Sequence, residues 1–217
     1  MDLWRQTDIV SKDAMDGLSF ILIGAGGIGS VVGLILVKMG VTDLTVYDPD
    51  VIEEHNIPNQ TYRLSDVGRP KVEALAEVCR DFAGVEIKTR QEMFTDSTLA
   101  SGVVISGVDS MESRMKIWRT VRYNPRALSY IEGRMGAQEG RVYTVTPHDP
   151  DQVRLYEATL HGDAEAEELP CTARSIAFNC FYLAGLLVSQ VKKVIMGEEV
   201  ALEVIFDLVT TTLIVPR

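Results

Sequence analysis

A glycine-rich segment stands between an apolar run and a predicted helix. It reads Gly-Ala-Gly-Gly-Ile-Gly over residues 24–29, after the apolar residues 18–23 and ahead of helical residues 28–39. In this context the spacing G-x-G-x-x-G permits a tight turn and a close approach of backbone to phosphate. The helix N-terminus adds N–H groups and a partial positive charge. The segment predicts a Rossmann-type nucleotide site, with Gly24, Gly26, Gly27 and Gly29 at the phosphates.

Two carboxylates follow the second predicted strand, residues 43–47. Asp48 comes directly after that strand, and Asp50 follows two residues later. An acidic residue about 20 positions beyond the glycines commonly binds ribose hydroxyls. Asp48 is therefore the predicted ribose ligand. Asp50 could assist, although a solvated aspartate in a turn explains it equally well.

The next segments carry a family resemblance. Residues 48–60 read DPDVIEEHNIPNQ, and residues 66–71 read DVGRPK. They resemble the D-x-D-x-V-x-x-x-N-L-x-R-Q … D-V-G-x-x-K signature of the ThiF/MoeB/ubiquitin-activating family. Arg5-Gln6 and residues 104–114, an apolar strand followed by Asp109 and Arg114, also resemble that family. The similarity covers nearly the whole chain and implies an enzyme that uses ATP to adenylate a carboxylate.

The resemblance also implies roles for individual residues. Lys71 would neutralise phosphate charge, and Asn56 and Gln60 would position phosphates or backbone through their amides. Asp109 would hold Mg²⁺, for which a hard carboxylate is suited; a helix N-cap is the alternative role. Arg5 would reach the ATP of a partner subunit, which implies a homodimer; a disordered N-terminal residue is the alternative.

One position departs from the family pattern. Where the family has Arg before the Gln, this chain has Asn59. A phosphate-binding guanidinium is thus missing from its usual place. Arg63 could substitute for it if the loop is remodelled. Without such a substitute, the site would be slower, altered in substrate or inactive.

Cys171 is a candidate nucleophile. Residues 169–174 read LPCTAR and resemble the C-T-x-R around the catalytic cysteine of ubiquitin-activating enzymes. A helix N-terminus and the nearby Arg174 would lower the pKa of its thiol. Cys79 and Cys180 are interpreted as buried apolar residues. A molybdopterin-type enzyme would instead stop at the acyl-adenylate, and Cys171 would then be structural.

These features lead to one functional prediction and two alternatives. The prediction is ATP- and Mg²⁺-dependent adenylation of the C-terminal glycine carboxylate of a ubiquitin-like or sulfur-carrier protein ending in Gly-Gly. Thioester formation on Cys171 could follow. One alternative is a catalytically impaired relative that only binds a carrier. The other is an NAD-dependent Rossmann enzyme, which leaves residues 56–71 unexplained.

Composition and charge exclude some classes of partner. The 217 residues carry a formal net charge of −10, and 46% of them are hydrophobic. An acidic chain repels nucleic acid and anionic membrane surfaces, so neither is expected as a partner. The three cysteines form no CxxC pair, so no structural zinc is expected. The free thiols and the absence of a signal-peptide pattern indicate a cytoplasmic protein.

The alternation of predicted elements favours an α/β fold. Strand and helix alternate up to residue 124, which predicts a Rossmann-like, mostly parallel sheet flanked by helices. We expect an antiparallel C-terminal extension of this sheet. The chain is interpreted as one ThiF-type domain, 1–217, with an N-terminal arm (1–17), a nucleotide-binding half (18–124) and a carrier-binding half (125–217). The carrier-binding half is expected to contain an exposed loop (148–170), a buried helix (172–196) and a terminal hairpin (201–215).

Overall fold

One eight-stranded sheet runs through the described chain. The computed structural model describes residues 1–95, 97–162 and 175–216. The strand order is β3-β2-β1-β4-β5-β6-β7-β8. The strands are β1 (Phe20–Ile23), β2 (Leu44–Tyr47), β3 (Lys88–Arg90), β4 (Gly102–Ser106), β5 (Ala127–Gly136), β6 (Glu139–Val145), β7 (Glu203–Asp207) and β8 (Thr212–Ile214). Neighbours from β3 to β5 are parallel, and those from β5 to β8 are antiparallel. The predicted fold class is confirmed.

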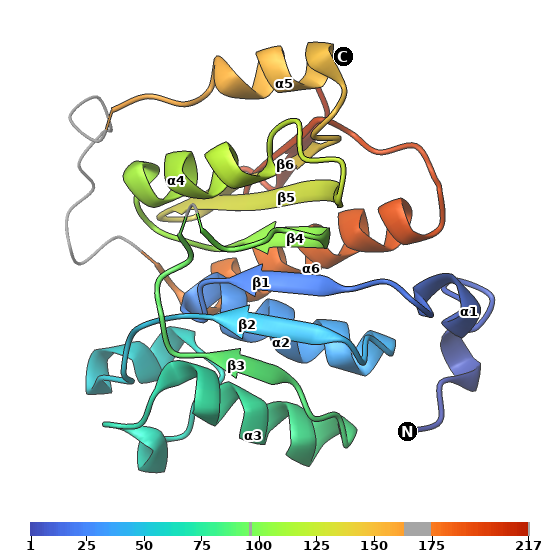
Figure 1. The fold of residues 1–217 in the computed structure, drawn as a ribbon. Helices are drawn as coiled ribbons and strands as arrows, with labels where there is room; N and C mark the ends of the chain where they lie inside the picture. The colour runs from blue at the N-terminus through green and yellow to red at the C-terminus, as the bar shows by residue number, and fades with distance from the viewer. Residues whose placement is uncertain (96, 163–174, 217) are drawn as a thin grey trace.

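Helices cover both faces of the sheet (Figure 1). On one face, α2 (Gly27–Met39), α3 (Lys71–Ala83) and α6 (Ala177–Ile195) bury their apolar sides in the larger core. On the other face, α4 (Met111–Val121) and α5 (Pro150–Glu157) enclose a smaller, aromatic core. The short elements are α1 (Lys12–Met15) and the 3₁₀ turns η1 (Trp4–Gln6), η2 (Glu54–Asn59) and η3 (Leu64–Asp66). No helix in the described ranges is long and apolar enough to cross a membrane.

The strand order creates a switch point between β1 and β4. The chain leaves β1 toward β2 on one side, whereas β4 continues to β5 on the other. Ligands of doubly wound sheets bind at such points, beyond the carboxyl ends of the strands. The loops after β1 and β4 touch here, because the Gly107 N–H donates to the Ile23 carbonyl at 2.9 Å. The fold thus brings the glycine segment and the Asp109 loop together.

The segment predicted as an exposed loop contains α5. The Asp149 side chain caps this helix by accepting from the N–H groups of Asp151 (3.0 Å) and Gln152 (3.2 Å). Val153 and Tyr156 are buried against the sheet. The loop prediction for 148–170 is therefore wrong over 150–157, because capping and two apolar side chains outweigh the polar composition. Residues 163–170 lie outside the described part.

Helix α6 is shorter and less buried than the sequence predicted. It begins at Ala177, since the backbone of Ile176 is extended. Phe178, Phe181 and Tyr182 are about half exposed on its outer face. The expectation of a largely buried helix is wrong on that face. The spacing of apolar residues alone did not reveal which side of α6 is not covered by the sheet.

Candidate nucleotide site

The glycine segment forms a turn whose shape excludes side chains at some positions and leaves space at others. Gly24 has φ +90°, a conformation that favours glycine. A Cβ on Gly29 would lie 1.8 Å from the Gly24 carbonyl oxygen. A Cβ on Gly26, the N-cap of α2, would meet nothing within 4 Å. The turn is closed on its inner side and open at the start of α2, where helix N–H groups favour an anion.

Asp48 links the end of β2 to this turn. Its carboxylate accepts from the Ala25 N–H at 2.6 Å and from the Asp50 N–H at 2.8 Å. The side chain is almost fully buried, and burial raises the pKa of the carboxyl above its ordinary value, although both N–H bonds act to lower the pKa. Each oxygen retains a second acceptor position. Asp48 can therefore accept ribose hydroxyls while it holds the turn.

Lys71 and Asp50 form an ion pair at the start of α3. The ammonium Nζ lies 2.7 Å from Asp50 Oδ2. The Lys71 side chain is 10% exposed, whereas that of Asp50 is 61% exposed. The carboxylate is thus well solvated, which weakens its hold on the cation. Asp50 thus positions the Lys71 ammonium at the start of α3.

The segment from Asn56 to Gln60 carries amides with different surroundings. Asn56 Oδ1 accepts from the Glu53 N–H at 2.9 Å and caps η2. Asn59 donates through Nδ2 to the Ser175 hydroxyl. Asn59 Oδ1 and Gln60 Oε1 are buried without a hydrogen-bond partner among the described residues. A neutral amide–hydroxyl pair occupies the place of the family's arginine, next to two acceptors that a ligand could satisfy.

Arg63 does not replace the missing arginine in this structure. Its guanidinium lies 2.6 Å from Asp81 and 3.7 Å from Glu77. Both carboxylates belong to α3 and lie more than one helical turn after Lys71. These acids neutralise Arg63 and hold its guanidinium against α3. The expectation of a phosphate role for Arg63 has no support in this geometry.

Asp109 is exposed in the loop between β4 and α4. The cap of α4 is Ser110, whose hydroxyl accepts from the Ser113 N–H at 3.2 Å. The alternative of a helix-capping Asp109 is therefore wrong. Among the described residues, no three His, Cys, Asp or Glu side chains gather to hold a metal. A single carboxylate suits Mg²⁺, which takes much of its coordination from water and nucleotide phosphates.

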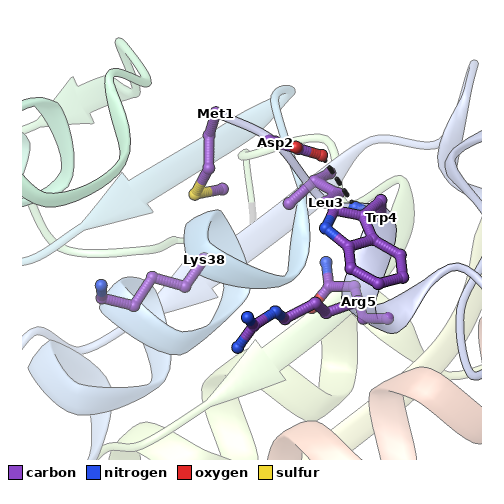
Figure 2. Close-up of a pocket in the computed structure, with 7 residues that line it drawn as sticks. Met1, Asp2, Leu3, Trp4, Arg5 and Lys38 are labelled. Atoms are coloured by element: carbon purple, nitrogen blue, oxygen red, sulfur yellow. Dashed lines mark hydrogen bonds between the residues drawn. The ribbon is translucent and has the colours of Figure 1, made fainter.

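Arg5 lies far from the glycine turn of its own chain. The arm is tied to the C-terminal end of α2, because Gln6 Nε2 donates to the Met39 carbonyl at 2.6 Å. Figure 2 shows Trp4, Arg5 and Lys38 around a shallow cavity of about 340 Å³ at this end. The 13 residues of α2 separate it from the turn by about 20 Å, at 1.5 Å per residue.

The structure describes two of the three cysteines, Cys79 and Cys180. Cys180 is buried in α6, and a Cβ on Gly27 would lie 3.1 Å from its sulfur. Burial raises the pKa of the Cys180 thiol to about 11 and that of Cys79 to about 12. Both are buried apolar residues, as predicted. Cys171 and Arg174 lie outside the described residues.

Tyr62 supports the site and was not predicted from the sequence. Its hydroxyl donates to the Ala25 carbonyl at 2.7 Å, and its ring is 5% exposed. Thr61, the preceding residue, also ties this segment to α2, since its N–H donates to the Ser30 hydroxyl. A tyrosine in a polar loop gave no signal for such a contact, because its partner lies 37 residues earlier.

Comparison with known proteins matches this arrangement to one family. The model described as the ThiF family matches residues 4–213. The SAMP-activating enzyme E1 of Haloferax volcanii is 28% identical over 137 residues, 60% of this chain and 50% of the relative. The NEDD8-activating enzyme E1 catalytic subunit of Arabidopsis thaliana is 34% identical over 111 residues, 48% of this chain and 24% of the relative. The chain thus spans half or less of the length of these curated relatives.

Solved structures share the fold. E. coli MccB, in a crystal structure with AMPCPP and MccA, has a TM-score of 0.73 at 17% identity. The match covers 95% of this chain and 65% of MccB. PaaA has a TM-score of 0.71 at 21% identity, over 98% of this chain and 68% of its own.

Proposed function

This chain belongs to the ThiF family, and from that premise we propose that it adenylates the C-terminal carboxylate of a ubiquitin-like or sulfur-carrier protein. The observation that carries the proposal is the contact between the loops after β1 and β4 at the switch point. The first loop contains the open turn at Gly26, to which Asp48 is bonded, and the second contains the exposed Asp109. Relatives named as activating enzymes for such modifiers support the substrate class.

The proposed reaction joins a carboxylate to AMP. A carboxylate oxygen of the carrier attacks the α-phosphorus of ATP, the bond to the β-phosphate oxygen breaks, and pyrophosphate leaves. The turn and the N-terminus of α2 bind phosphate, Asp48 binds the ribose, and Lys71 neutralises charge on the leaving group. Asp109 would hold Mg²⁺, which supplies charge neutralisation at the phosphates.

Asn56 and Gln60 have lesser parts in the proposal. The unpartnered Gln60 Oε1 faces no described donor, so a nucleotide or water hydrogen can satisfy it. Asn56 acts through the backbone, since its side chain caps η2. Asp50 positions Lys71.

We propose that the active unit is a homodimer in which Arg5 serves the partner's site. Within one chain, Arg5 and the glycine turn lie at opposite ends of α2, so Arg5 cannot assist its own ATP. A two-fold dimer can bring the arm of one copy to the turn of the other. The exposed Trp4 beside Arg5 supplies apolar area for that contact.

The test of the proposed function is ATP–pyrophosphate exchange with candidate carriers ending in Gly-Gly. Wild-type protein should catalyse carrier-dependent exchange that requires Mg²⁺. Asp109→Asn should remain folded, because the side chain is exposed, and should lose exchange, because the anionic ligand is gone. Absence of exchange with every carrier, despite ATP binding, would refute the proposal. Binding of NAD in preference to ATP would instead identify a dehydrogenase-type Rossmann enzyme.

We further propose that Cys171 accepts the acyl group as a thioester. Its thiolate attacks the acyl-adenylate carbonyl and AMP leaves, so the acyl–sulfur bond replaces the acyl–phosphate bond. Wild-type protein should form a carrier adduct on a non-reducing gel that thiols release. Cys171→Ala should abolish the adduct but retain pyrophosphate exchange. Cys180→Ala is the control and should keep the adduct, because the Cys180 thiol is buried and protonated. Adenylate without adduct would make this chain an adenylyltransferase only.

The Asn59–Ser175 pair favours one other function, a carrier-binding relative with little activity. A neutral pair stabilises phosphate charge less than a guanidinium does. This alternative predicts carrier binding without exchange at saturating ATP. Asn59→Arg would then raise exchange strongly. In a competent wild-type enzyme, the same substitution should bring little gain.

A further inference from the structure

Glu132 is a fully buried carboxylate that the proposed reaction does not use. It lies on β5 and is 0% exposed. Its Oε1 lies 2.8 Å from Arg114 Nε and 2.5 Å from Arg134 Nε. Its Oε2 accepts from the hydroxyls of Tyr130 and Tyr156. Burying a charge is costly, and full pairing of this kind is what makes it tolerable.

One partner of Glu132 reaches the Asp109 loop. The guanidinium of Arg114 on α4 is 7% exposed. It donates to the carbonyls of Val108 at 2.6 Å and Asp109 at 3.3 Å. Its third nitrogen, Nε, forms the ion pair with Glu132 Oε1 at 2.8 Å, without the alignment of a hydrogen bond. The planar fork of one arginine thus joins the carboxylate to two consecutive backbone carbonyls.

We propose that Glu132 is a positioning residue, which fixes the backbone of Val108 and Asp109 through Arg114 and so aims the Asp109 carboxylate at the metal. This inference rests on the proposed role of Asp109 as the Mg²⁺ ligand. The sheet register supports it, since Ser106 at the end of β4 pairs with Glu132 on β5. The rigid end of the sheet therefore lies directly beside the loop that it orients.

A second guanidinium, that of Arg134, holds Glu132 in place. Arg134 donates to the Thr159 carbonyl at 2.9 Å and to its hydroxyl at 3.1 Å. It also stacks over Tyr143, with 4.5 Å to the ring centroid. Arg134 thus ties Glu132 to the chain after α5. The carboxylate is held by this contact and presents a fixed charge to Arg114.

Glu132→Gln tests the proposal through the metal requirement. Outer partners of metal ligands typically change metal affinity by 10–100-fold when mutated. The Mg²⁺ concentration for half-maximal ATP-dependent thermal stabilisation should rise about tenfold in the variant. The affinity for ATP without Mg²⁺ should stay within about twofold of the wild-type value, because the turn and Asp48 are untouched. A general loss of stability would lower the melting temperature without this selective shift.

Two further variants keep the test decisive. Arg114→Lys keeps the charge, but an ammonium cannot span Glu132 and both carbonyls, so it should raise the Mg²⁺ requirement likewise even if Glu132→Gln fails to fold. Glu203→Gln is the matched control. Glu203 on β7 also accepts from an arginine and a tyrosine, Arg141 and Tyr143, but does not contact the Asp109 loop. An unchanged Mg²⁺ requirement in folded Glu132→Gln or Arg114→Lys would overturn the inference.

Hydrogen exchange separates this inference from the proposed function. If wild-type protein shows no Mg²⁺-dependent response to ATP, the metal role of Asp109 fails. Amides of residues 107–110 should still exchange on the order of tenfold faster in Glu132→Gln than in the wild type or Glu203→Gln, because the loop loses its anchor. Equal protection of these amides in all three proteins would show that Glu132 does not hold the loop.

Discussion

Single residues at the glycine turn have distinct steric tasks. Gly29 packs its α-carbon against the Gly24 carbonyl, where a Cβ would approach to 1.8 Å. We predict that Gly29→Ala destabilises the fold by about 1–3 kcal/mol or more, because the contact is with backbone and cannot relax. Urea denaturation measures this loss of unfolding free energy.

Gly26→Ala is the matched control for that substitution. Its Cβ would meet nothing within 4 Å, and its φ of −81° suits alanine. We predict near wild-type stability but weakened ATP binding in a calorimetric titration, because the methyl occupies the space expected for phosphate. Equal ATP affinity in Gly26→Ala and the wild type would place the phosphates elsewhere.

The raised pKa of Asp48 predicts a pH dependence of stability. The folded state holds the Asp48 proton more tightly than the unfolded state, so Asp48 favours folding below about pH 4 and loses this contribution as pH rises through the raised pKa. The stability of the wild type relative to Asp48→Asn should therefore fall from about pH 4 upward. Urea denaturation of both proteins across this range measures the difference.

Asp207 supplies a control of opposite sign. The Thr210 hydroxyl and neighbouring N–H groups lower the pKa of this carboxyl. Its contribution is present above about pH 4 and is lost as pH falls through the lowered pKa. The stability of the wild type relative to Asp207→Asn should therefore rise with pH. If both differences rise with pH, the Asp48 assignment is wrong, and if both fall, the Asp207 assignment is wrong.

Residue types and spacing predicted part of the arrangement of the candidate site. The glycines, Asp48 and Asp109 follow strand ends, and parallel strands place their carboxyl ends at one edge. Chain order is then enough to bring such residues together. The ion pairs of Arg63 could not be predicted in this way, because a long side chain can reach several carboxylates. Its partners lie 14 and 18 residues later, on α3. Glu132 was also missed, since a charge inside a strand is normally read as its exposed side.

At the scale of elements, α5 shows how capping decides a polar segment. The Asp149 carboxylate satisfies two N–H groups of the first turn, and Pro150 starts the helix. We predict that Asp149→Ala lowers the free energy of unfolding by about 1 kcal/mol. Asp151→Ala, which removes only an exposed pair with Arg154, should cost less. Equal losses in urea denaturation would show that the cap contributes no more than a surface ion pair.

The strands of the sheet, parallel and antiparallel, were more predictable than the helices between residues 148 and 196. Strands β1, β2 and β4 are short apolar runs bounded by glycine or aspartate, which is typical of strands buried on both faces. The start of α5 carried a readable signal in Asp149-Pro150, but the acidic composition around it suggested a loop. The exposed side of α6 could not be predicted from the sequence, because its exposure depends on which elements from other parts of the chain pack against the helix.

The whole molecule has its proposed site and its proposed arginine at opposite ends of α2. In Figure 1 the N-terminus and α1 lie at the edge opposite the arrowheads of β1 and β2. In one copy, the proposed nucleotide site is therefore far from Arg5 of the same chain. The sequence alone could suggest this arrangement only through family resemblance, since the distance between the two ends depends on how the arm packs against Met39.

This separation predicts complementation between two inactive variants. Arg5→Ala and Asp109→Ala should each abolish pyrophosphate exchange. In a mixed dimer, the Arg5→Ala copy keeps its own Asp109 and receives Arg5 from the Asp109→Ala copy, so one of the two sites is complete. An equal mixture should recover about a quarter of wild-type activity, because half of the dimers are mixed and each has one complete site. A mixture of Asp48→Ala with Asp109→Ala is the control and should stay inactive, since both residues serve the site of their own chain. Recovery in neither mixture, with dimers present, would show that Arg5 does not act on the partner.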